Sequence, residues 1–426
     1  MEVYFLSKVF FMETLALLLF YAWKTAPLWL PASLAVFFWI SWVGYKRTQY
    51  LDKQKMVLLE VKVPKNVDKS PLAMEVVLNS LYQTSGESTW YDRYVLGKVR
   101  ADFSLEMVSI EGDIHFFIRT RPFVRKNIEN HVYSQYPTAE IYEAEDYTPI
   151  VPFAKSGSDW NLFGLEYKLS KPDPYPIKTY IDYELDRDKF EEKKVDPITP
   201  TLEFLGGIGK GEQIWVQILV QANKGKKDPT TPWKGRDWQG EAKVLINKIM
   251  EDAKERSGSI SEEGNDFRLA MLTEGERNAI KAIERSVSKL GFDCGIRALY
   301  IARKDVFEPG NISGLFGLLR QYNSNDLNGF KYSRYTDVDY PWQDYIDFDL
   351  ANPISLTGSR VARLRWMLFD AYRRRSWFHP PYERKPFVLN TEELATIFHF
   401  PGRVSETPTF ERIASKKSEP PANLPI

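Results

Sequence analysis

The first 45 residues contain two apolar stretches, each of helical length. Residues 9–23 carry one charged side chain, and residues 28–45 carry none. A helix rises about 1.5 Å per residue, so about 20 apolar residues span the hydrocarbon core of a bilayer. A secretory signal peptide is the rival interpretation, but a second apolar span directly after it is atypical. The pattern therefore predicts a transmembrane helical hairpin over residues 1–47, with its turn at residues 24–27.

Aromatic and basic residues accompany the second apolar stretch. Tryptophan favours the interface between bilayer and water, and clusters of lysine and arginine remain on the cytoplasmic side. Basic residues follow this stretch, so the sequence predicts the bacterial inner (cytoplasmic) membrane, with the bulk of the chain in the cytoplasm. The residues expected to hold the hairpin in the membrane are Trp29, Trp39, Trp42, Lys46 and Arg47.

From residue 56 onward, apolar residues recur with the periods of short strands and helices. A strand is expected at residues 56–64, and Ser70-Pro71 suits the start of a helix. Two alternating stretches meet at Glu111-Gly112, which indicates a β-hairpin. Another helix and another strand follow, up to residue 147. The order βαββαβ is that of the ferredoxin-like split motif.

The second half of the chain repeats this alternation. Residues 213–222 and 294–303 have the character of apolar strands, and residues 273–292 have the spacing of an amphipathic helix. The predicted fold class is α+β, with an N-terminal transmembrane hairpin followed by tandem ferredoxin-like (βαββαβ) units. The predicted domains are the hairpin at 1–47, two α+β domains at 48–190 and 191–385, and a docking helix with a proline-rich tail at 386–426.

Composition narrows the chemistry that the chain can perform. Lysine plus arginine and aspartate plus glutamate number 57 each, so no net charge draws the whole chain to nucleic acid. The single cysteine, Cys294, excludes an internal disulfide, and no histidine lies near it in sequence, which favours a core residue over a reactive thiol. The four histidines lack metal-ligand spacing, so we expect no metal site.

A glycine-rich segment, GGIGKGE at residues 206–212, has some features of a phosphate-binding loop. The Walker A pattern needs serine or threonine after its lysine, and here glycine follows Lys210. The segment also leads from an expected helix into an expected strand, which reverses the order in P-loop proteins. The sequence contains no serine-hydrolase elbow, HExxH motif or dinucleotide fingerprint. We therefore expect a chain that is not an enzyme and has no cofactor.

Arginines alternate with aromatic residues over residues 362–382. Such a pattern can contact a nucleic-acid backbone and stack on bases. The alternative is a helix with one face in a core, whose arginines are solvated or meet anionic lipid head groups. The sequence leaves both interpretations open. The candidate contact residues are Arg363, Arg365, Arg373, Arg374, Arg375 and Trp377.

Three segments together resemble one known family: LGGIGKGEQIWVQILV at 205–220, FVLNTEELATIFHFPG at 387–402 and TPTFERIASKKSEPPANLP at 407–425. Similar segments occur in the membrane-anchored region of coupling-protein-like ATPases of type IV secretion and conjugation systems of candidate-phylum bacteria. The last two segments lie just before the motor domain of that family. The resemblance implies a role in secretion or DNA transfer, with the energy-converting residues in the motor domain.

This sequence stops at Ile426, where that motor domain would begin. We therefore expect either a fragment of a motor protein or a non-catalytic component that links a P-loop ATPase, acting in trans, to the membrane. The rival hypothesis is a membrane-tethered nucleic-acid-binding protein, and a homo-oligomer and DNA remain open as partners. The helix near residue 394 would either dock the ATPase or pack on its own domain. Its candidate docking residues are Leu394, Ile397, Phe398 and Phe400.

Overall fold

The computed structural model describes residues 2–63, 69–153, 157–186, 195–225, 237–256, 272–337 and 359–402. The chain divides into two compact units. The first contains Met1–Gln54 and Gly86–Val99, and the second contains Lys55–Ser85 and Arg100–Ile426. The predicted proline-rich tail, including the resembling segment at 407–425, lies outside the described residues.

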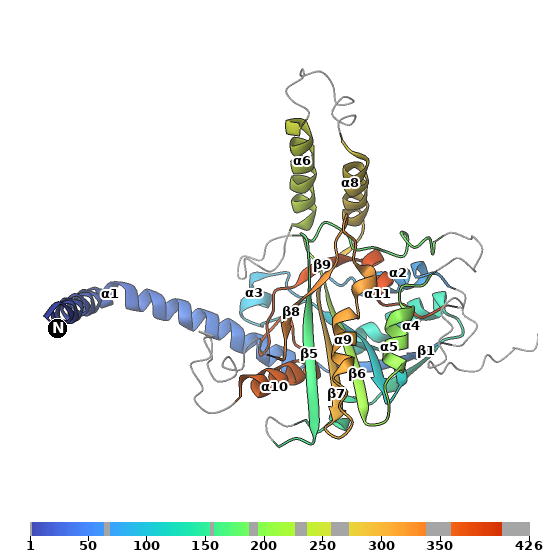
Figure 1. The fold of residues 1–426 in the computed structure, drawn as a ribbon, viewed down its shortest axis with the longest axis horizontal. Helices are drawn as coiled ribbons and strands as arrows, with labels where there is room; N and C mark the ends of the chain where they lie inside the picture. Colours follow the sequence, from blue (N-terminus) through green and yellow to red (C-terminus); the bar gives the residue numbers. More distant parts are fainter. Residues whose placement is uncertain are drawn as a thin grey trace, which may run out of the picture. The chain divides into compact units, whose positions relative to one another are not determined.

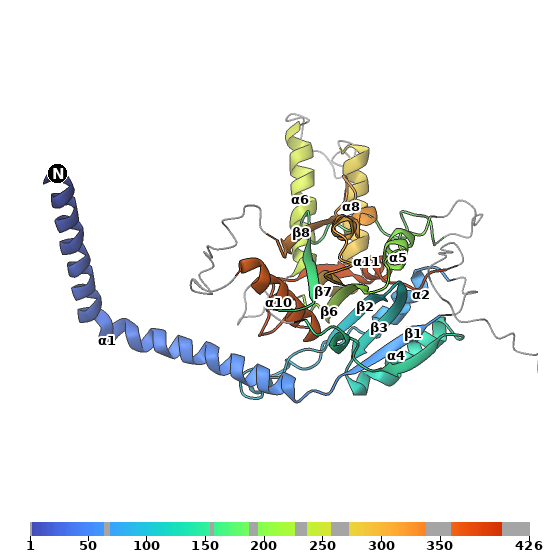
Figure 2. The same cartoon turned by 60° about the horizontal axis from the view of Figure 1, so that its bottom comes forward.

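One continuous helix replaces the predicted hairpin in the first unit. Helix α1 (Glu2–Asp52) passes through residues 24–27 without a turn, with Pro27 and Pro31 inside it (Figures 1 and 2). Proline is disfavoured in a helix interior, which is why the sequence predicted an interruption there. Among the described residues, no helix is both long enough and apolar enough to cross a membrane. The predicted transmembrane hairpin is therefore wrong, as is the inner-membrane location inferred from it.

A single antiparallel sheet organises the second unit. Of its nine strands in the described residues, eight take the order β4-β1-β3-β2-β6-β7-β5-β8, and the ninth, β9, pairs with β7. Their bounds are β1 (Val57–Lys62), β2 (Asp102–Ile110), β3 (Asp113–Thr120), β4 (Glu140–Ala144), β5 (Trp160–Leu169), β6 (Glu212–Ala222), β7 (Gly291–Arg303), β8 (Phe330–Tyr335) and β9 (Phe387–Asn390).

Two successive sets of four strands supply the two halves of this sheet. Strands β1 to β4 take the order β4-β1-β3-β2, and β5 to β8 take the mirrored order β6-β7-β5-β8. Strand β2 pairs with β6 from Asp102↔Gln221 to Ile110↔Gln213, and this pairing joins the halves into one layer. The predicted fold class is thus corrected in a second respect, because the two predicted ferredoxin-like motifs form one large sheet within the second unit. A short-range sequence pattern cannot reveal a pairing between strands so far apart in the chain.

Helices cover the two faces of the sheet unequally. One face is covered by α2 (Leu72–Asn79), α4 (Pro122–Gln135), α5 (Thr199–Gly206), α9 (Gly310–Gly317) and α11 (Thr391–Ile397), which share the larger core with the strands. On the opposite face, α10 (Arg360–Arg373) packs against β5 over a smaller core. Central strand β6 is buried along its whole length and is rich in isoleucine and valine, which suit a strand covered on both faces.

Helices α6 (Trp238–Arg256) and α8 (Glu274–Val287) pack side by side and extend away from the sheet (Figures 1 and 2). A capping box between Thr273 and Glu276 begins α8. At the base of this pair, a Cβ added to Gly291 of β7 would lie 2.9 Å from the Trp238 ring. The glycine therefore permits the close contact between α6 and the sheet.

Candidate functional site

A row of polar side chains crosses the middle of the sheet on the face that α10 covers. Glu106 of β2 is the register partner of Gln217 of β6, which in turn faces Arg297 of β7. Arg297 is also the register partner of Glu166 on β5. All four side chains are fully buried. Burying a charged group is costly unless it is paired and hydrogen-bonded. The row therefore requires compensating groups, and the segment that follows α10 supplies several of them.

Arg375, just after α10, provides that compensation at one end of the row. Its Nε lies 3.1 Å from Glu106 Oε1, and its Nη1 lies 2.6 Å from Asp146 Oδ2. The Ser104 and Tyr147 hydroxyls donate to Glu106 at 2.5 and 2.7 Å. Burial opposes ionisation of Glu106, but the Arg375 charge and these hydrogen bonds outweigh it and lower the pKa of the carboxyl. The pair is therefore ionised at neutral pH and satisfied within the fold.

Glu166 and Arg297 occupy the other end of the row. The Tyr382 hydroxyl donates to Glu166 at 2.7 Å, and Arg384 Nε donates at 3.2 Å. The Arg297 guanidinium lies over the rings of Trp377 and Tyr382, at 5.0 and 5.3 Å from their centres. These are favourable cation–π distances. The segment after α10 is thus fixed to the sheet by charged and aromatic contacts that sequence analysis did not find.

This packing divides the arginine run that was predicted to contact nucleic acid or lipid. Arg375 and Trp377 are buried, Arg363 and Arg365 are half-buried, and Arg373 and Arg374 are exposed. Arg365 Nη1 donates to Asn161 Oδ1 at 2.8 Å. Arg374 pairs with Asp370, one helical turn earlier, also at 2.8 Å. The structure therefore does not bring the six residues together on one exposed surface.

The residues predicted to dock a partner lie in the core. Leu394, Ile397, Phe398 and Phe400 are each at most 1% exposed. The rings of Phe398 and Phe400 contact Phe116 of β3 at centroid distances of 5.7 and 5.5 Å. The segment thus packs on its own unit, which is the second of the two interpretations that the sequence left open.

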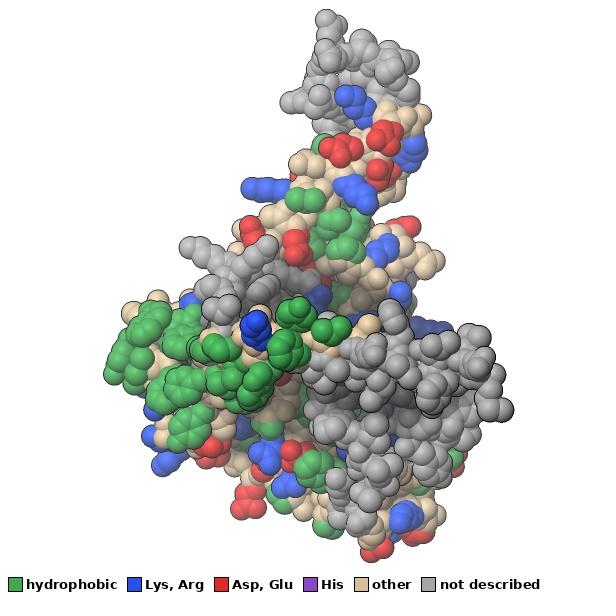
Figure 3. Space-filling view, turned by 90° about the vertical axis from the view of Figure 1, so that its left-hand side faces the viewer, with side chains coloured by type: hydrophobic (Ala, Val, Ile, Leu, Met, Phe, Trp, Pro, Cys, Tyr) green, Lys and Arg blue, Asp and Glu red, His purple; other side chains and the backbone are tan. Residues whose placement is uncertain are grey.

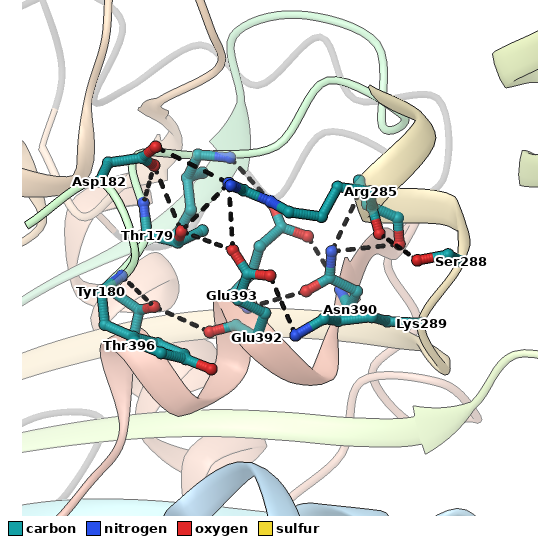
Figure 4. A network of polar contacts seen from close by, with 12 residues as sticks. Thr179, Tyr180, Asp182, Arg285, Ser288, Lys289, Asn390, Glu392, Glu393 and Thr396 are labelled. Atoms are coloured by element: carbon teal, nitrogen blue, oxygen red, sulfur yellow. Dashed lines mark hydrogen bonds and ion pairs between the residues drawn. The ribbon is translucent and has the colours of Figure 1, made fainter. Parts of the chain in front are cut away.

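A second polar cluster surrounds the N-terminus of α11 (Figure 4). Asn390 and Glu393 form a capping box, a pattern that the sequence NTEE could have revealed. The Glu393 carboxyl accepts hydrogen bonds from the backbone N–H groups of Asn390 and Ile177, both at 2.9 Å. Burial nevertheless raises the pKa of Glu393 to about 8.

Lys289, just after α8, links α2 to α11 in the same cluster. Its Nζ lies 2.9 Å from Glu75 of α2 and 3.0 Å from Glu392 of α11. Arg285 of α8 lies 3.2 Å from Glu392. Burial opposes the charge on Lys289, but the two carboxylates outweigh it and raise the pKa of the ammonium group. Because these residues are far apart in sequence, no local pattern could have predicted the cluster.

Aromatic contacts hold the short helix α3 (Trp90–Tyr94) against α1 within the first unit. Trp42 Nε1 donates to the Tyr94 carbonyl at 3.1 Å, and the Trp39 ring lies 5.2 Å from the Tyr94 ring. The Lys46 ammonium lies 4.9 Å above the Trp42 ring. Three of the residues predicted as membrane anchors therefore contribute to the internal packing of this unit.

Helix α1 also exposes many apolar side chains (Figure 3). Of the remaining predicted anchor residues, Trp29 is 49% exposed and Arg47 is buried. Phe37 and Phe38 are exposed by 70% and 64%. Other exposed apolar residues of α1 are Leu17, Phe20, Tyr21, Trp23, Leu30, Leu34, Val36 and Ile40. Contiguous apolar surface of this kind marks an interaction site.

Within the described residues, no group of three or more histidine, cysteine, aspartate or glutamate side chains is placed to hold a metal ion. Cys294 is buried in β7, and burial raises the pKa of its thiol well above the ordinary value. A thiol in this state is a poor nucleophile, so Cys294 is a core residue.

The arrangement of helices and strands defines an α+β protein built on one large antiparallel sheet. Residues 46–412 match the family described as "Domain of unknown function (DUF8128)", and the chain belongs to this family. The matched range begins within α1 and includes every strand of the sheet. No curated protein matches the chain.

Proposed function

We propose that this chain is a non-catalytic binding module of a type IV secretion or conjugative DNA-transfer machine. In that machine it binds a separate P-loop ATPase. The observation that carries the proposal is the exposed apolar surface of α1. The segments at 205–220 and 387–402, which resemble those of secretion ATPases, suggest the class of the partner.

The character of α1 supports a protein partner. Its exposed apolar side chains include several phenylalanine and tryptophan residues, the types that dominate binding hot spots. An aromatic side chain buries about 150–250 Å² when it is covered. Phe37, Phe38 and Trp23 alone therefore offer a large share of the roughly 800 Å² that each partner buries in a standard interface.

The buried charges support a structural role for the second unit. Glu106 and Arg375 compensate each other inside the fold, as do Glu75 and Lys289. A general acid, base or nucleophile must instead reach a bound substrate. We therefore assign the energy-converting step to the partner ATPase.

Affinity purification of the full chain from its native host, followed by quantitative mass spectrometry, tests this proposal. The wild type should recover a P-loop ATPase in near-stoichiometric amount, and the double variant Phe37→Gln/Phe38→Gln should lose most of it. Phe123→Gln on α4 is the matched control, because Phe123 is 69% exposed and lies outside α1. Recovery of no ATPase, or equal recovery by the wild type and the double variant, would contradict the proposal.

Nucleic-acid binding is a second candidate function, favoured by the exposure of Arg373 and Arg374. The test variant is Arg373→Ala/Arg374→Ala, and buried Arg375 is left unchanged to preserve the fold. Salt-sensitive DNA binding that this variant loses would favour this candidate.

A further inference from the structure

A groove lies between α9 and β8, the last strand of the sheet. Its volume is about 430 Å³, which is within the usual range for binding pockets. Phe316 and Tyr332 line the groove and are 39% and 55% exposed, with their ring centres 5.2 Å apart. Tyr167 and Phe330 are buried beneath them. The groove therefore offers aromatic surface to an apolar or aromatic side chain.

The charged residues at this groove are basic. Arg320 and Lys331 are among the residues that border it, and no aspartate or glutamate in the described part of the chain does so. Lys168 of β5 is the direct register partner of Lys331. Like charges placed opposite each other in an antiparallel pair are destabilising. Neither lysine forms an ion pair with a residue in the described part of the chain, so an anionic partner would relieve their repulsion.

Strand β8 ends the sheet, and its outer edge has no partner strand among the described residues. An edge strand presents backbone N–H and C=O groups to which another extended chain can pair. Successive side chains of a strand point to opposite faces. Lys331 and Tyr332 are consecutive in β8, so the Lys331 side chain points to the face opposite the groove and only the rest of the residue borders the groove. A peptide paired to β8 would therefore place alternate side chains over the aromatic groove, next to Tyr332, and the others on the opposite face, next to the Lys331 side chain.

We propose that the β8 edge binds an extended peptide segment of a partner protein in which apolar or aromatic residues alternate with acidic residues. The aromatic side chains enter the groove beside Phe316 and Tyr332, and the acidic side chains meet Lys168 and Lys331. The peptide backbone pairs with β8. No residue of this site belongs to α1, so variants of the two surfaces can be tested independently.

A seven-residue, fluorescently labelled peptide that alternates glutamate with phenylalanine is the probe, with binding to the full chain measured by anisotropy. Lys331→Glu and Tyr332→Ser should each weaken binding by about tenfold or more, because they remove a central charge or aromatic anchor. Lys281→Glu and Tyr91→Ser, at exposed positions elsewhere, are matched controls that should bind as the wild type does. Circular dichroism checks that each variant is folded.

Three results would overturn the proposal: no binding of this peptide by the wild type, equal binding of a peptide with lysine in place of glutamate, or equal binding by the two groove variants. A peptide methylated on alternate backbone nitrogens should fail to bind, because it cannot pair with a strand edge. Binding of an oligothymidylate in place of the peptide, lost in the groove variants, would also overturn it. The Phe37→Gln/Phe38→Gln variant should bind the peptide normally, which separates this site from the proposed ATPase contact.

Discussion

Replacing Arg375 with methionine should strongly destabilise the second unit. Arg375 contacts Glu106 and Asp146 through four hydrogen bonds of 2.6–3.3 Å. Without it, the fully buried Glu106 loses its cation. Removing one partner of a buried ion pair costs about 3–5 kcal/mol. Methionine retains a Cβ and a long side chain, so any strain from the positive φ of 52° at this position is unchanged.

Urea unfolding followed by tryptophan fluorescence measures this loss as a decrease in the free energy of unfolding. The control is Arg374→Ala, because the Arg374 side chain is 58% exposed in its ion pair with Asp370. An exposed pair contributes less than about 1 kcal/mol. Adding Glu106→Gln to Arg375→Met should restore about 1–3 kcal/mol of the lost free energy of unfolding, because a neutral amide replaces an uncompensated carboxylate.

The loss of stability caused by Arg375→Met should also depend on pH. The folded-state pKa of Glu106 is lowered below its ordinary value of 4.5, so the stabilisation is present above pH 4.5 and disappears as the pH falls through the folded-state pKa. The difference between wild type and Arg375→Met should therefore narrow at acid pH. A loss of stability no larger than that of Arg374→Ala, or a difference that stays constant with pH, would show that Arg375 does not compensate a buried Glu106 carboxylate.

Three further predictions concern single positions. Glu393→Gln should remove a pH dependence of the free energy of unfolding. Burial raises the pKa of Glu393 from 4.5 to about 8, so the wild type should lose stability relative to the variant as the pH rises between these values. Urea unfolding at several pH values measures this difference. Gly295→Ala should lower the free energy of unfolding by about 1–3 kcal/mol in the same assay, because overpacking is destabilising. The added Cβ would lie 2.1 Å from the Trp377 ring, whereas Gly275→Ala, with open space around it, should cause no loss. Gly97→Ala should speed limited proteolysis within residues 86–99, because Gly97 has a φ of +67° and its Cβ would lie 2.4 Å from the α1 backbone.

Local sequence patterns predicted much of the order of elements in the second unit. The strand expected at 56–64 is β1, because its run of apolar residues is short and bounded by polar ones. Glu111 and Gly112 form the expected turn between β2 and β3, with φ values of 55° and 99°. The glycine-rich segment at 206–212 joins α5 to β6, as its order in the sequence indicated.

The buried polar row could not be predicted in the same way. Glu106 and Glu166 become part of one row only through the pairing of β2, β6, β7 and β5, which depends on contacts between distant parts of the chain. Arginine is rarely buried, so the run that contains Arg375 suggested a solvated surface. The apolar stretch in α1 likewise suggested a bilayer because periodicity does not show what covers a helix.

Site-specific photo-cross-linking in the native host tests directly whether α1 binds a P-loop ATPase. A photoreactive amino acid is placed at Phe37, which is 70% exposed on α1, and the cross-linked peptides are identified by mass spectrometry. We expect cross-links to a P-loop ATPase that are absent when the probe is placed at Phe123. Cross-links from position 37 that reach no P-loop ATPase, including cross-links to DNA alone, would contradict it.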